Sequence, residues 1–417
     1  MKTLYFFTDT FPLGGITEQS FILPEINAID KSFDRVTILP ESKMTTGKRL
    51  DLPAKFIVDQ SLCNMKRSRS EVGLLLHLFN PFVFSLLYKE KRRIKNKSQF
   101  FSFLRYIDKS ILYKAYVEDL LRKKAIDPQN TIFYSFWFTE ITFALAMLCK
   151  KYDLNIYCRA HGYDIYDERV LFRSHSIRMF TLSKMQTVYP CSKNGKEYIS
   201  KQYPLYSDKI KVSYLGCEKL FDTVNPKSAN GKSIIFFTCA RLHKVKRLPM
   251  TFGILSEVAQ YYGDKQVKWV IVGEGEERVT LENLISNNKC GNFEVELLGA
   301  LSNKDIHDYY AKNHIDFGIL LSESEGLSIS VCEQIAYKIP GIVTNVGGLP
   351  EIINDSNGIL LSSEPTSNEL ISKLTRIIND ANLYDTICNN AYATWKKKFK
   401  SDINRMEFIE KLSLIDC

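Results

Sequence analysis

A short apolar run that leads through a polar, glycine-containing loop into a helix constrains the fold of this chain more than any other feature. Residues 317–321 predict a buried strand, and residues 328–336 predict a helix. A loop between them sets backbone N–H groups at the helix N-terminus, where anions bind. Glu325 lies in the loop and Glu333 lies about one turn into the helix. We therefore expect both carboxylates to face one ligand.

The same alternation of apolar runs and helical segments recurs along all 417 residues. It is typical of doubly wound α/β domains, in which ligands bind at the carboxyl ends of parallel strands. We expect an N-terminal domain over 1–220, a turn-rich linker at 222–232 and a C-terminal domain over 221–391. A last helix over 392–417 is expected to cross back to the first domain. The expected strands are 2–8, 35–39, 131–136, 156–159, 186–191 and 209–214 in the first domain, and 233–239, 268–272, 294–298, 316–321 and 341–344 in the second.

Positive charge is concentrated in the first half of the chain. Residues 1–220 hold 35 Lys and Arg against 22 Asp and Glu, whereas the remainder holds 21 against 25. Such an excess favours an anionic partner, a phosphorylated lipid, a membrane surface or a nucleic acid, over a mere solubility bias. Among these we expect an anionic membrane surface and no nucleic acid.

Residues 72–88 form the most lipophilic stretch, and a basic run at 89–97 follows directly. The stretch is interrupted by His77, Asn80 and Pro81 and is shorter than the ~20 residues of a spanning helix. One interpretation is a segment resting on an anionic bilayer, where each cation contributes roughly 1 kcal/mol. The other is a core helix followed by a solvated, charged helix, and the sequence leaves both open.

Cysteine usage and the first residues indicate the compartment. The ten cysteines show neither a C-x-x-C pair nor zinc-ligand spacing, which fits reduced thiols in a cytosolic protein. The first apolar run breaks at Asp9 and is too short for a signal peptide. We therefore expect a cytoplasmic protein that lies peripherally on the inner face of the cell membrane.

No Asp-x-Asp sequence occurs, so we expect neither a metal ion nor a cofactor.

Two loops of the expected N-terminal domain carry candidate residues. Gly14 and Gly15 follow the first strand, where they would line the ligand site, although most Gly-Gly pairs are simple turns. His161 follows the strand 156–159. An isolated histidine is more often a satisfied core residue, but its place beside Arg159 and Asp164 at a strand end favours an active-site role.

The expected C-terminal domain adds two cations. Arg241 and Lys246 lie five residues apart after the strand 233–239, and both can reach a diphosphate near the amides of Ser328. Charge-assisted hydrogen bonds of this kind contribute about 1.5–3 kcal/mol each. They would stabilise the charge that develops on a departing diphosphate. Glu333 is placed to accept the two hydroxyls of a ribose, and Glu325 to contact a transferred sugar.

These residues resemble the motifs of retaining glycosyltransferases of family four, of the type that builds bacterial surface polysaccharides. Glu325 and Glu333 match its E-x7-E motif. The other similarities occur in the family's order along nearly the whole chain, at Phe11-Pro12 through Glu18, Arg159-Ala160-His161-Gly162-Tyr163-Asp164, Ala240-Arg241-Leu242 through Lys246, Val272-Gly273-Glu274-Gly275 and Val346-Gly347-Gly348-Leu349-Pro350-Glu351.

The resemblance implies a GT-B fold, which has two Rossmann-like doubly wound domains facing across a cleft. It also implies roles by position: Arg241 and Lys246 on the donor diphosphate, Glu333 on the ribose, Glu325 on the sugar, His161 by the reacting centre, Gly14 and Gly15 near the phosphates, Gly299 near the base, and Gly326, Leu327 and Ser328 in the donor site. The sequence departs from the family pattern at Ala240, Arg247, Leu327 and Ser328, which bears on the identity of the donor sugar.

The expected activity is that of a metal-independent, retaining hexosyltransferase in cell-surface polysaccharide biosynthesis, such as that of lipopolysaccharide or capsule. It would move a sugar from a nucleotide diphosphate-sugar to a saccharide acceptor, lipid-linked in the version we favour. Two alternatives remain. A nucleotide-sugar epimerase on the same fold would need no acceptor. A non-catalytic polysaccharide- or membrane-binding subunit would bind anionic vesicles without nucleotide affinity.

Overall fold

The computed structural model describes all residues except 15, 43–49, 66–69, 124–125, 224–231 and 415–417. Most of the expected linker therefore lies outside the described residues, and so does Gly15. The chain divides into two compact units. The N-terminal unit holds Met1–Ser213 together with Arg405–Cys417, and the C-terminal unit holds Tyr214–Asn404.

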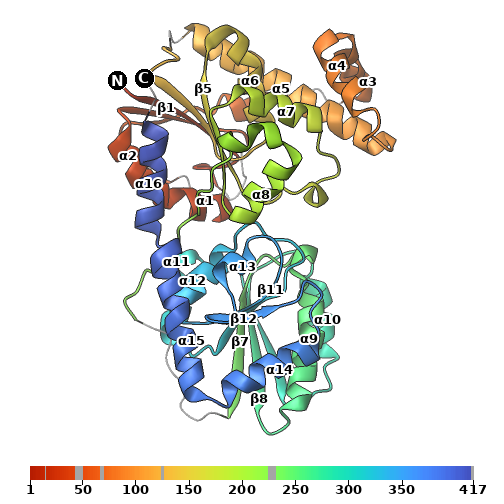
Figure 1. Ribbon diagram of the computed structural model, residues 1–417, viewed down its shortest axis with the longest axis vertical. Coiled ribbons are helices and arrows are strands. Elements are labelled where there is room, and N and C mark those ends of the chain that lie inside the picture. Colours follow the sequence, from red (N-terminus) through yellow and green to blue (C-terminus); the bar gives the residue numbers. More distant parts are fainter. Residues whose placement is uncertain (15, 43–49, 66–69, 124–125, 224–231, 415–417) are drawn as a thin grey trace. The chain divides into compact units, whose positions relative to one another are not determined.

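The N-terminal unit is built on a six-stranded parallel sheet of order β3-β2-β1-β4-β5-β6 (Figure 1). Its strands form where short apolar runs can be buried on both faces by helices. The strands are β1 (Thr3–Thr8), β2 (Arg35–Pro40), β3 (Phe56–Val58), β4 (Thr131–Ser135), β5 (Asn155–Ala160) and β6 (Thr187–Pro190). The α-helices are α1 (Ile16–Ile22), α2 (Ile26–Ser32), α3 (Glu71–Leu75), α4 (Pro81–Glu90), α5 (Lys97–Lys123), α6 (Glu140–Tyr152), α7 (His175–Lys184) and α8 (Lys193–Gln202).

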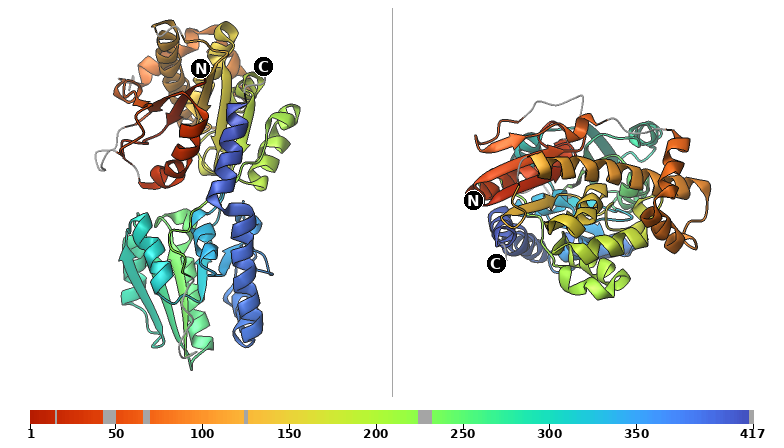
Figure 2. Two further views of the ribbon diagram at one scale, coloured as in Figure 1. Left: turned by 90° about the vertical axis from the view of Figure 1, so that its left-hand side faces the viewer. Right: turned by 90° about the horizontal axis from the view of Figure 1, so that it is seen from above.

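The C-terminal unit repeats this topology with the order β12-β11-β10-β7-β8-β9, again entirely parallel. Figure 2 shows the same units from two further sides. The strands are β7 (Ser233–Cys239), β8 (Gln266–Val272), β9 (Phe293–Gly299), β10 (Phe317–Leu320), β11 (Gly341–Thr344) and β12 (Gly358–Leu361). The α-helices are α9 (Leu248–Tyr261), α10 (Arg278–Ser286), α11 (Asn303–Lys312), α12 (Ile329–Ala336), α13 (Leu349–Ile352), α14 (Ser367–Ile378) and α15 (Ala381–Thr394). The last helix, α16 (Ser401–Ser413), is divided between the two units.

This strand order has a functional consequence. In each sheet the order of the strands reverses at one point, between β1 and β4 in the first unit and between β7 and β10 in the second. Ligands of doubly wound sheets bind outside the carboxyl ends of the strands at such a reversal. The loops that follow these four strands are therefore the first place to look for a site.

Two of the predicted elements do not form as expected. Residues 209–214 do not form a strand, because after a 3₁₀ turn that ends at Lys209 only an isolated bridge pairs Ile210 with β6. The expected helix over 392–417 is not continuous either. A π-helical turn at Trp395–Phe399 and an extended Lys400 separate α15 from α16. Helix α16 begins in the C-terminal unit and ends in the N-terminal one, where Phe408 packs against Tyr134.

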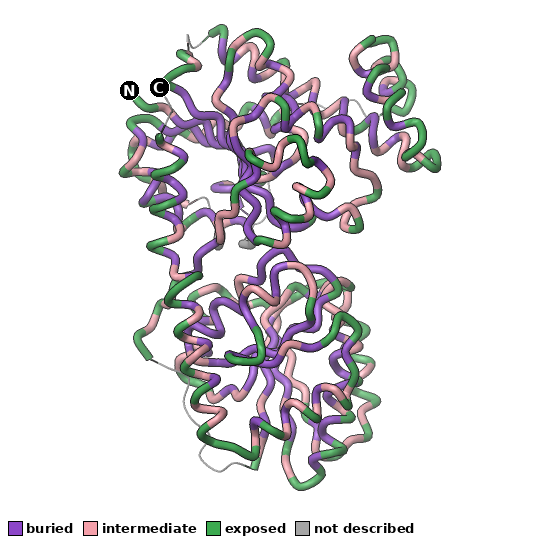
Figure 3. The backbone as a smooth tube through the Cα atoms, viewed as in Figure 1, coloured by how far each residue is buried: buried purple, intermediate pink, exposed green. Residues whose placement is uncertain are grey.

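Both sheets are buried, whereas the segment α3–α4 exposes much of its surface (Figure 3). The expected helical region 66–124 consists of α3, the 3₁₀ turn Leu76–Phe79, α4 and the long helix α5. No single helix among the described residues is long and apolar enough to cross a membrane. Only Glu71–Phe79 and Pro81–Glu90, bent by 102° relative to one another, pass this criterion as a pair.

Candidate active site

Four loops of the C-terminal unit meet at the reversal point of its sheet. The loop after β10 is tied to the loop after β7, because the Glu323 N–H donates to the Val245 carbonyl at 2.8 Å. The loop after β11 is tied to it as well, since the Gly348 N–H donates to the Glu325 carbonyl at 3.1 Å. The loop after β8 joins through the Leu242 N–H, which donates to the Glu274 carbonyl at 2.9 Å.

Two glycines make these close approaches possible. Gly347 has a φ of +52°, and a Cβ at this position would lie 1.7 Å from the Glu325 carbonyl oxygen. Gly273 has a φ of +143°, and its Cβ would lie 1.9 Å from the Ala240 carbonyl oxygen. Any side chain would both strain the backbone and push the loops apart. This is the physical reason for the glycines in the two family-like motifs.

Lys246 and Glu325 form an ion pair in this structure. The Lys246 Nζ lies 2.9 Å and 2.7 Å from the two carboxylate oxygens of Glu325. Their side chains are only 16% and 12% exposed, so water screens the pair weakly. The structure thus brings two predicted residues together directly, although the sequence placed one on the diphosphate and the other on the sugar.

Glu333 lies on α12 and faces α11. Its Oε1 accepts a hydrogen bond from Asn303 Nδ2 at 3.1 Å and lies 3.6 Å from His307 Nε2. The other ring nitrogen of His307 lies 3.0 Å from the hydroxyl of Tyr337. Among the described residues no side chain bonds Oε2, which leaves one carboxylate oxygen for a ligand.

Asn303 and His307 were not predicted. Ser302 caps α11 by accepting from the Asp305 N–H, and this cap places Asn303 in the first turn, opposite Glu333. Nothing in the sequence pattern links residues 30 positions apart on different helices. The only local signal was the Ser302–Asp305 capping sequence, which predicts the helix start but not its neighbour.

Arg241 and the start of α12 complete the edge of the sheet. Arg241 is exposed, and in the described part of the chain its guanidinium has neither a hydrogen bond nor an ion pair. Ser328 precedes α12, and its Oγ lies 3.2 Å from that of Ser330. Gly326, Leu327 and Ser328 are buried in the preceding loop. A free cation and uncapped helix N–H groups are the ordinary means of holding phosphate.

Cys239, at the end of β7, occupies the interior of this edge. Burial raises the pKa of its thiol to about 12, and the nearby Glu333 carboxylate contributes in the same direction. The thiol is therefore neutral at physiological pH and behaves as a small apolar side chain. Gly299 ends β9, and its carbonyl accepts from the Gly273 N–H at 2.8 Å. That carbonyl is therefore already engaged, and a contact of this segment with a base stays a prediction.

The opening loop of the N-terminal unit is held by a buried carboxylate that was not predicted as a site residue. Glu18 accepts hydrogen bonds from the backbone N–H groups of Asp9, Thr10 and Phe11 and from the indole of Trp137, all within 2.6–2.8 Å. The loop after β1 and the loop after β4 are thereby joined at the reversal point. Gly14 lies in the loop after β1.

His161 follows β5 and is 8% exposed. Its ring lies 4.6 Å from that of Phe136 and 4.3 Å from that of Trp137, measured between centroids. Among the described residues neither ring nitrogen has a hydrogen-bond partner. Its Nδ1 is 3.8 Å from Asp164 Oδ2, beyond hydrogen-bond range. The imidazole therefore keeps its full hydrogen-bonding capacity.

Asp164 orders the His161 loop. Its Oδ1 accepts from the N–H groups of His161 at 2.7 Å and Gly162 at 3.0 Å, and its Oδ2 accepts from Phe138 at 3.0 Å. Burial would raise the pKa of the carboxyl, but His161 and the backbone donors outweigh it and hold the pKa below its ordinary value. Arg159 is a structural residue, since it is fully buried against Glu25 at 2.8 Å.

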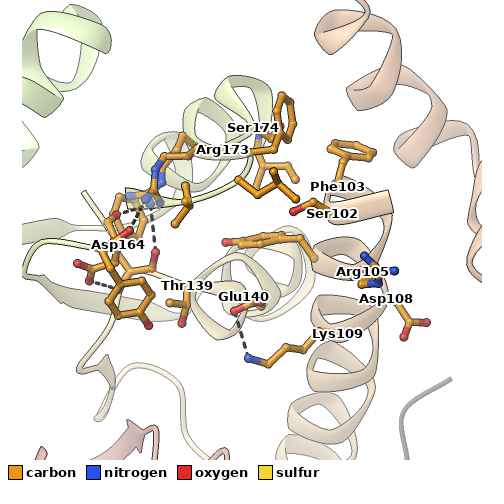
Figure 4. A pocket seen from close by; sticks show the side chains of 18 of the residues that line it. Ser102, Phe103, Arg105, Asp108, Lys109, Thr139, Glu140, Asp164, Arg173 and Ser174 are labelled. Atoms are coloured by element: carbon orange, nitrogen blue, oxygen red, sulfur yellow. Dashed lines mark hydrogen bonds and ion pairs between the residues drawn. The ribbon is translucent and has the colours of Figure 1, made fainter. Parts of the chain in front are cut away.

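A cavity of the N-terminal unit lies beside this loop and has a volume of about 620 Å³. Figure 4 shows Arg105, Asp108 and Lys109 on α5, with Glu140 opposite Lys109 and Arg173 across the opening. Lys109 pairs with Glu140 at 3.2 Å. Several aromatic rings form its walls, namely those of Phe103, Tyr106, Phe138, Tyr163 and Phe172. Aromatic walls with a few polar groups are typical of small-molecule sites.

Among the described residues, no group of three or more His, Cys, Asp or Glu side chains could hold a metal ion. Metal independence nevertheless stays a prediction, because the phosphate groups of a bound donor could themselves recruit a cation.

Comparison with known proteins identifies the C-terminal unit. Its residues 222–394 match the family "Glycosyl transferases group 1". This part of the chain belongs to the group 1 glycosyltransferases. One component of the human phosphatidylinositol N-acetylglucosaminyltransferase is 29% identical over 146 residues, which are 35% of this chain and 29% of that protein. The O-antigen biosynthesis glycosyltransferase WbnH of Escherichia coli is 32% identical over 144 residues, 34% of this chain and 37% of that one.

The matched segment thus spans about a third of the length of these curated relatives. The solved structures extend the likeness to the whole chain. The UDP complex of HepE from Anabaena covers 99% of this chain and 100% of its own, with a TM-score of 0.67 at 16% identity. At that identity the likeness shows the fold alone. The predicted GT-B fold is confirmed, and the predicted glycosyltransferase family is matched over residues 222–394.

Proposed function

We propose that the protein transfers a sugar from a nucleotide diphosphate-sugar to a saccharide hydroxyl and retains the anomeric configuration. The observation that carries the proposal is the edge of the C-terminal sheet, where Arg241, the Lys246–Glu325 pair and the start of α12 gather at the reversal point. Cations, helix N–H groups and a ribose-accepting carboxylate form a complementary set for such a donor.

The chemistry of the step follows from these groups. The acceptor oxygen bonds to the anomeric carbon while the bond from that carbon to the diphosphate oxygen breaks. The electron pair leaves with the diphosphate, and the acceptor proton passes to the departing phosphate oxygen. Arg241 and Lys246 would stabilise the charge that develops there, without a metal ion. Glu333 would use its free Oε2 to accept the ribose hydroxyls, and Glu325 would contact the sugar.

Lys246 has to serve two partners in this scheme. In the structure both of its strong contacts go to Glu325. A diphosphate would draw the ammonium partly away, and the freed carboxylate of Glu325 could then accept from a sugar hydroxyl. We propose that the ion pair presets both side chains, so that donor binding rearranges one contact instead of ordering two flexible chains.

In the N-terminal unit we propose the aromatic cavity as the site of the acceptor. Its volume of about 620 Å³ lies within the range of roughly 300–1,000 Å³ that is usual for ligands. Arg105, at its opening, is exposed and has no ion pair among the described residues. His161 lies on the neighbouring loop with both ring nitrogens available. We retain it as a proposed catalytic residue, and Gly14 as part of the phosphate-facing loop.

We further propose that the acceptor is lipid-linked, as in the biosynthesis of lipopolysaccharide or capsule, and that the enzyme works peripherally at the inner face of the cell membrane. The name of one relative refers to O-antigen biosynthesis, and that of another to phosphatidylinositol N-acetylglucosaminyl transfer. The basic excess of the first half of the chain supports an anionic surface as partner.

The test is nucleotide release from a panel of UDP-, GDP- and ADP-sugars, with and without short saccharide acceptors, followed by analysis of the product's anomeric configuration. We expect acceptor-dependent release and an α-linked product from an α-linked donor. Isomerised donor without nucleotide release would instead identify an epimerase. Lys246→Ala should lower kcat about 10²–10³-fold, whereas Lys244→Ala, on the same turn but exposed, should not. Equal rates in both variants would contradict the proposed roles.

A further inference from the structure

The segment from α3 to α4 exposes large apolar side chains in a way that the rest of the unit does not. Val72, Leu76, Phe79, Phe84 and Tyr88 are between 57% and 85% exposed. Soluble domains expose single apolar residues everywhere, but a group of them within one short segment indicates an interaction surface. Leu75, also exposed, completes this group, which we call the apolar patch.

The patch arises from the way α4 packs against the rest of the unit. Val83, Leu86 and Glu90 form its buried side, at helical spacing. Glu90 fixes the helix to the start of α7, since its Oε1 accepts from Ser174 Oγ at 3.0 Å. The opposite side therefore presents Phe84 and Tyr88, which lie four residues apart. A helix that only packed on a core would carry polar residues there.

Unpaired cations border the patch. Lys89, Lys91, Arg92 and Lys95 are exposed, and among the described residues none of them has an ion pair. The Lys91 ammonium lies 3.8 Å from the centroid of the Tyr88 ring, so this cation stacks on an aromatic side chain of the patch. Two acidic side chains lie nearby, and both pair with other cations: the buried Glu90 with Arg93 at 3.4 Å, and Glu71 with Lys97 at 3.6 Å.

A shallow apolar groove opens within the same surface. Its walls come from α4, the following turn and the start of α5, and its volume is about 290 Å³. The lining residues are Phe84, Leu87, Tyr88, Lys91, Ile94 and Phe100. A groove with aliphatic and aromatic walls and one lysine at its border is complementary to an acyl chain below an anionic headgroup.

We propose that the apolar patch and its basic border form a docking surface for an anionic lipid bilayer, with Phe79, Phe84 and Tyr88 entering the headgroup region. Aromatic rings favour that depth, and cations favour the headgroup charge. Bilayer docking fits better than pairing with a second copy of the chain. Two copies joined through the patch would oppose Lys89, Lys91, Arg92 and Lys95 to one another, which is unfavourable.

The surface also gives the proposed lipid-linked acceptor a route to its site. Leu74, on the buried side of α3, lines the aromatic cavity, whereas Val72 and Leu76 of the same segment face outward. This link rests on the proposed function, but the docking itself does not. Vesicle binding and donor binding can therefore be measured and can fail separately.

The test is cosedimentation of the full chain with two kinds of vesicle, of phosphatidylcholine alone and of phosphatidylcholine with phosphatidylglycerol. We expect about tenfold or stronger preference for the anionic vesicles at 0.1 M salt and its loss at 1 M salt, where the screening length falls to about 3 Å. The double variant Phe79→Ser/Phe84→Ser should bind about tenfold more weakly. Lys91→Glu/Lys95→Glu should lose the anionic preference.

The control is Leu205→Ser, which removes an apolar side chain of the same unit that is 82% exposed but lies outside the patch. This control should bind vesicles as the unchanged protein does. All variants should keep the melting temperature of the unchanged protein. The proposal is overturned if the unchanged protein does not prefer anionic vesicles, or if the Phe79→Ser/Phe84→Ser variant binds as tightly as the Leu205→Ser control. It is equally overturned if the protein forms a dimer that this double variant abolishes.

Discussion

Lys246 and Glu325 are the residues through which the C-terminal site is most tightly organised. They are 79 positions apart in the chain, and their side chains meet only because the loops after β7 and β10 lie next to each other at the reversal of the sheet. The charges of a weakly solvated pair are interdependent, because removing one leaves the other without its partner.

A double-mutant cycle would measure this dependence. Lys246→Met and Glu325→Gln should each lower the free energy of unfolding by about 1–3 kcal/mol, because each leaves one group with unmet hydrogen bonds. The double variant should cost less than the sum of the two changes. Strictly additive changes in urea unfolding would show that the two side chains do not interact.

A second prediction concerns Glu333 and its neighbour Asn303, which was not predicted as a site residue. Asn303→Ala removes the hydrogen bond that fixes Oε1 at 3.1 Å but leaves the carboxylate in place. We expect the donor KM to rise about tenfold with a smaller change in kcat, since the bond positions a binding group. Asn303→Asp should be worse than Ala, because it sets two carboxylates against each other. An unchanged KM in both variants would remove Asn303 from this role.

At the scale of elements, most of the fold could be predicted from the sequence. Ten of the eleven expected strands form, with ends within a few residues, because buried parallel strands are short apolar runs. β3 and β12 were missed. The three residues of β3 are too few to show a periodicity, whereas β12 is as long as β10 and β11, which were predicted. The π-helical turn before α16 has no local sequence signal either.

The candidate site, like the fold, could be predicted from the sequence only in part. The loops, glycines and charged residues follow from position at strand ends, and each could be named in advance. The partners could not, because the pairing of Lys246 with Glu325, and of Glu333 with Asn303, depends on how helices and loops pack. The backbone at Arg247 explains why a glycine often stands at this position in the family pattern. It has a φ of +52°, in the left-handed region where a glycine is the ordinary choice.

The loop after β11 supports a prediction at this scale. Gly347→Ala would place a methyl group 1.7 Å from the Glu325 carbonyl oxygen and would strain a residue whose φ is +52°. We expect a loss of about 2–4 kcal/mol in unfolding free energy and weaker donor binding, because the loop that carries Glu325 must move. Gly253→Ala, on α9 with open space around it, is the control and should be neutral or stabilising. Equal stability of the two variants would contradict the role of the close contact.

At the scale of the whole molecule, each unit repeats one topology and places its buried polar groups at the same edge. In the N-terminal unit these groups are the carboxylates of Glu18 and Asp164, which each accept several backbone N–H bonds. Both hold loops, not substrates. Stability and the proposed reaction therefore depend on the same edge, and acid should affect them together.

The pH dependence of stability follows from Asp164. Its pKa is lowered in the folded protein, so its contribution is complete above the unfolded value of about 3.9 and is lost as pH falls through the folded pKa. Urea unfolding between pH 6 and pH 2 should therefore show a decline that Asp164→Asn makes shallower. Asp208→Asn, an exposed carboxyl, should leave the slope unchanged. Identical slopes for the Asp164 variant and the unchanged protein would contradict this assignment.

The most direct test of the account is the binding of a nucleotide diphosphate by the full chain. UDP, GDP and ADP should be titrated in a thermal-unfolding assay against the unchanged protein, Lys246→Ala and the control Lys244→Ala. One of the three nucleotides should stabilise the unchanged protein by about 2.7 kcal/mol at 100 times its Kd, and the control equally. The Lys246→Ala variant should need a much higher concentration for the same shift. A protein that none of the three stabilises, or a Lys246→Ala variant that responds as the control does, would contradict the account.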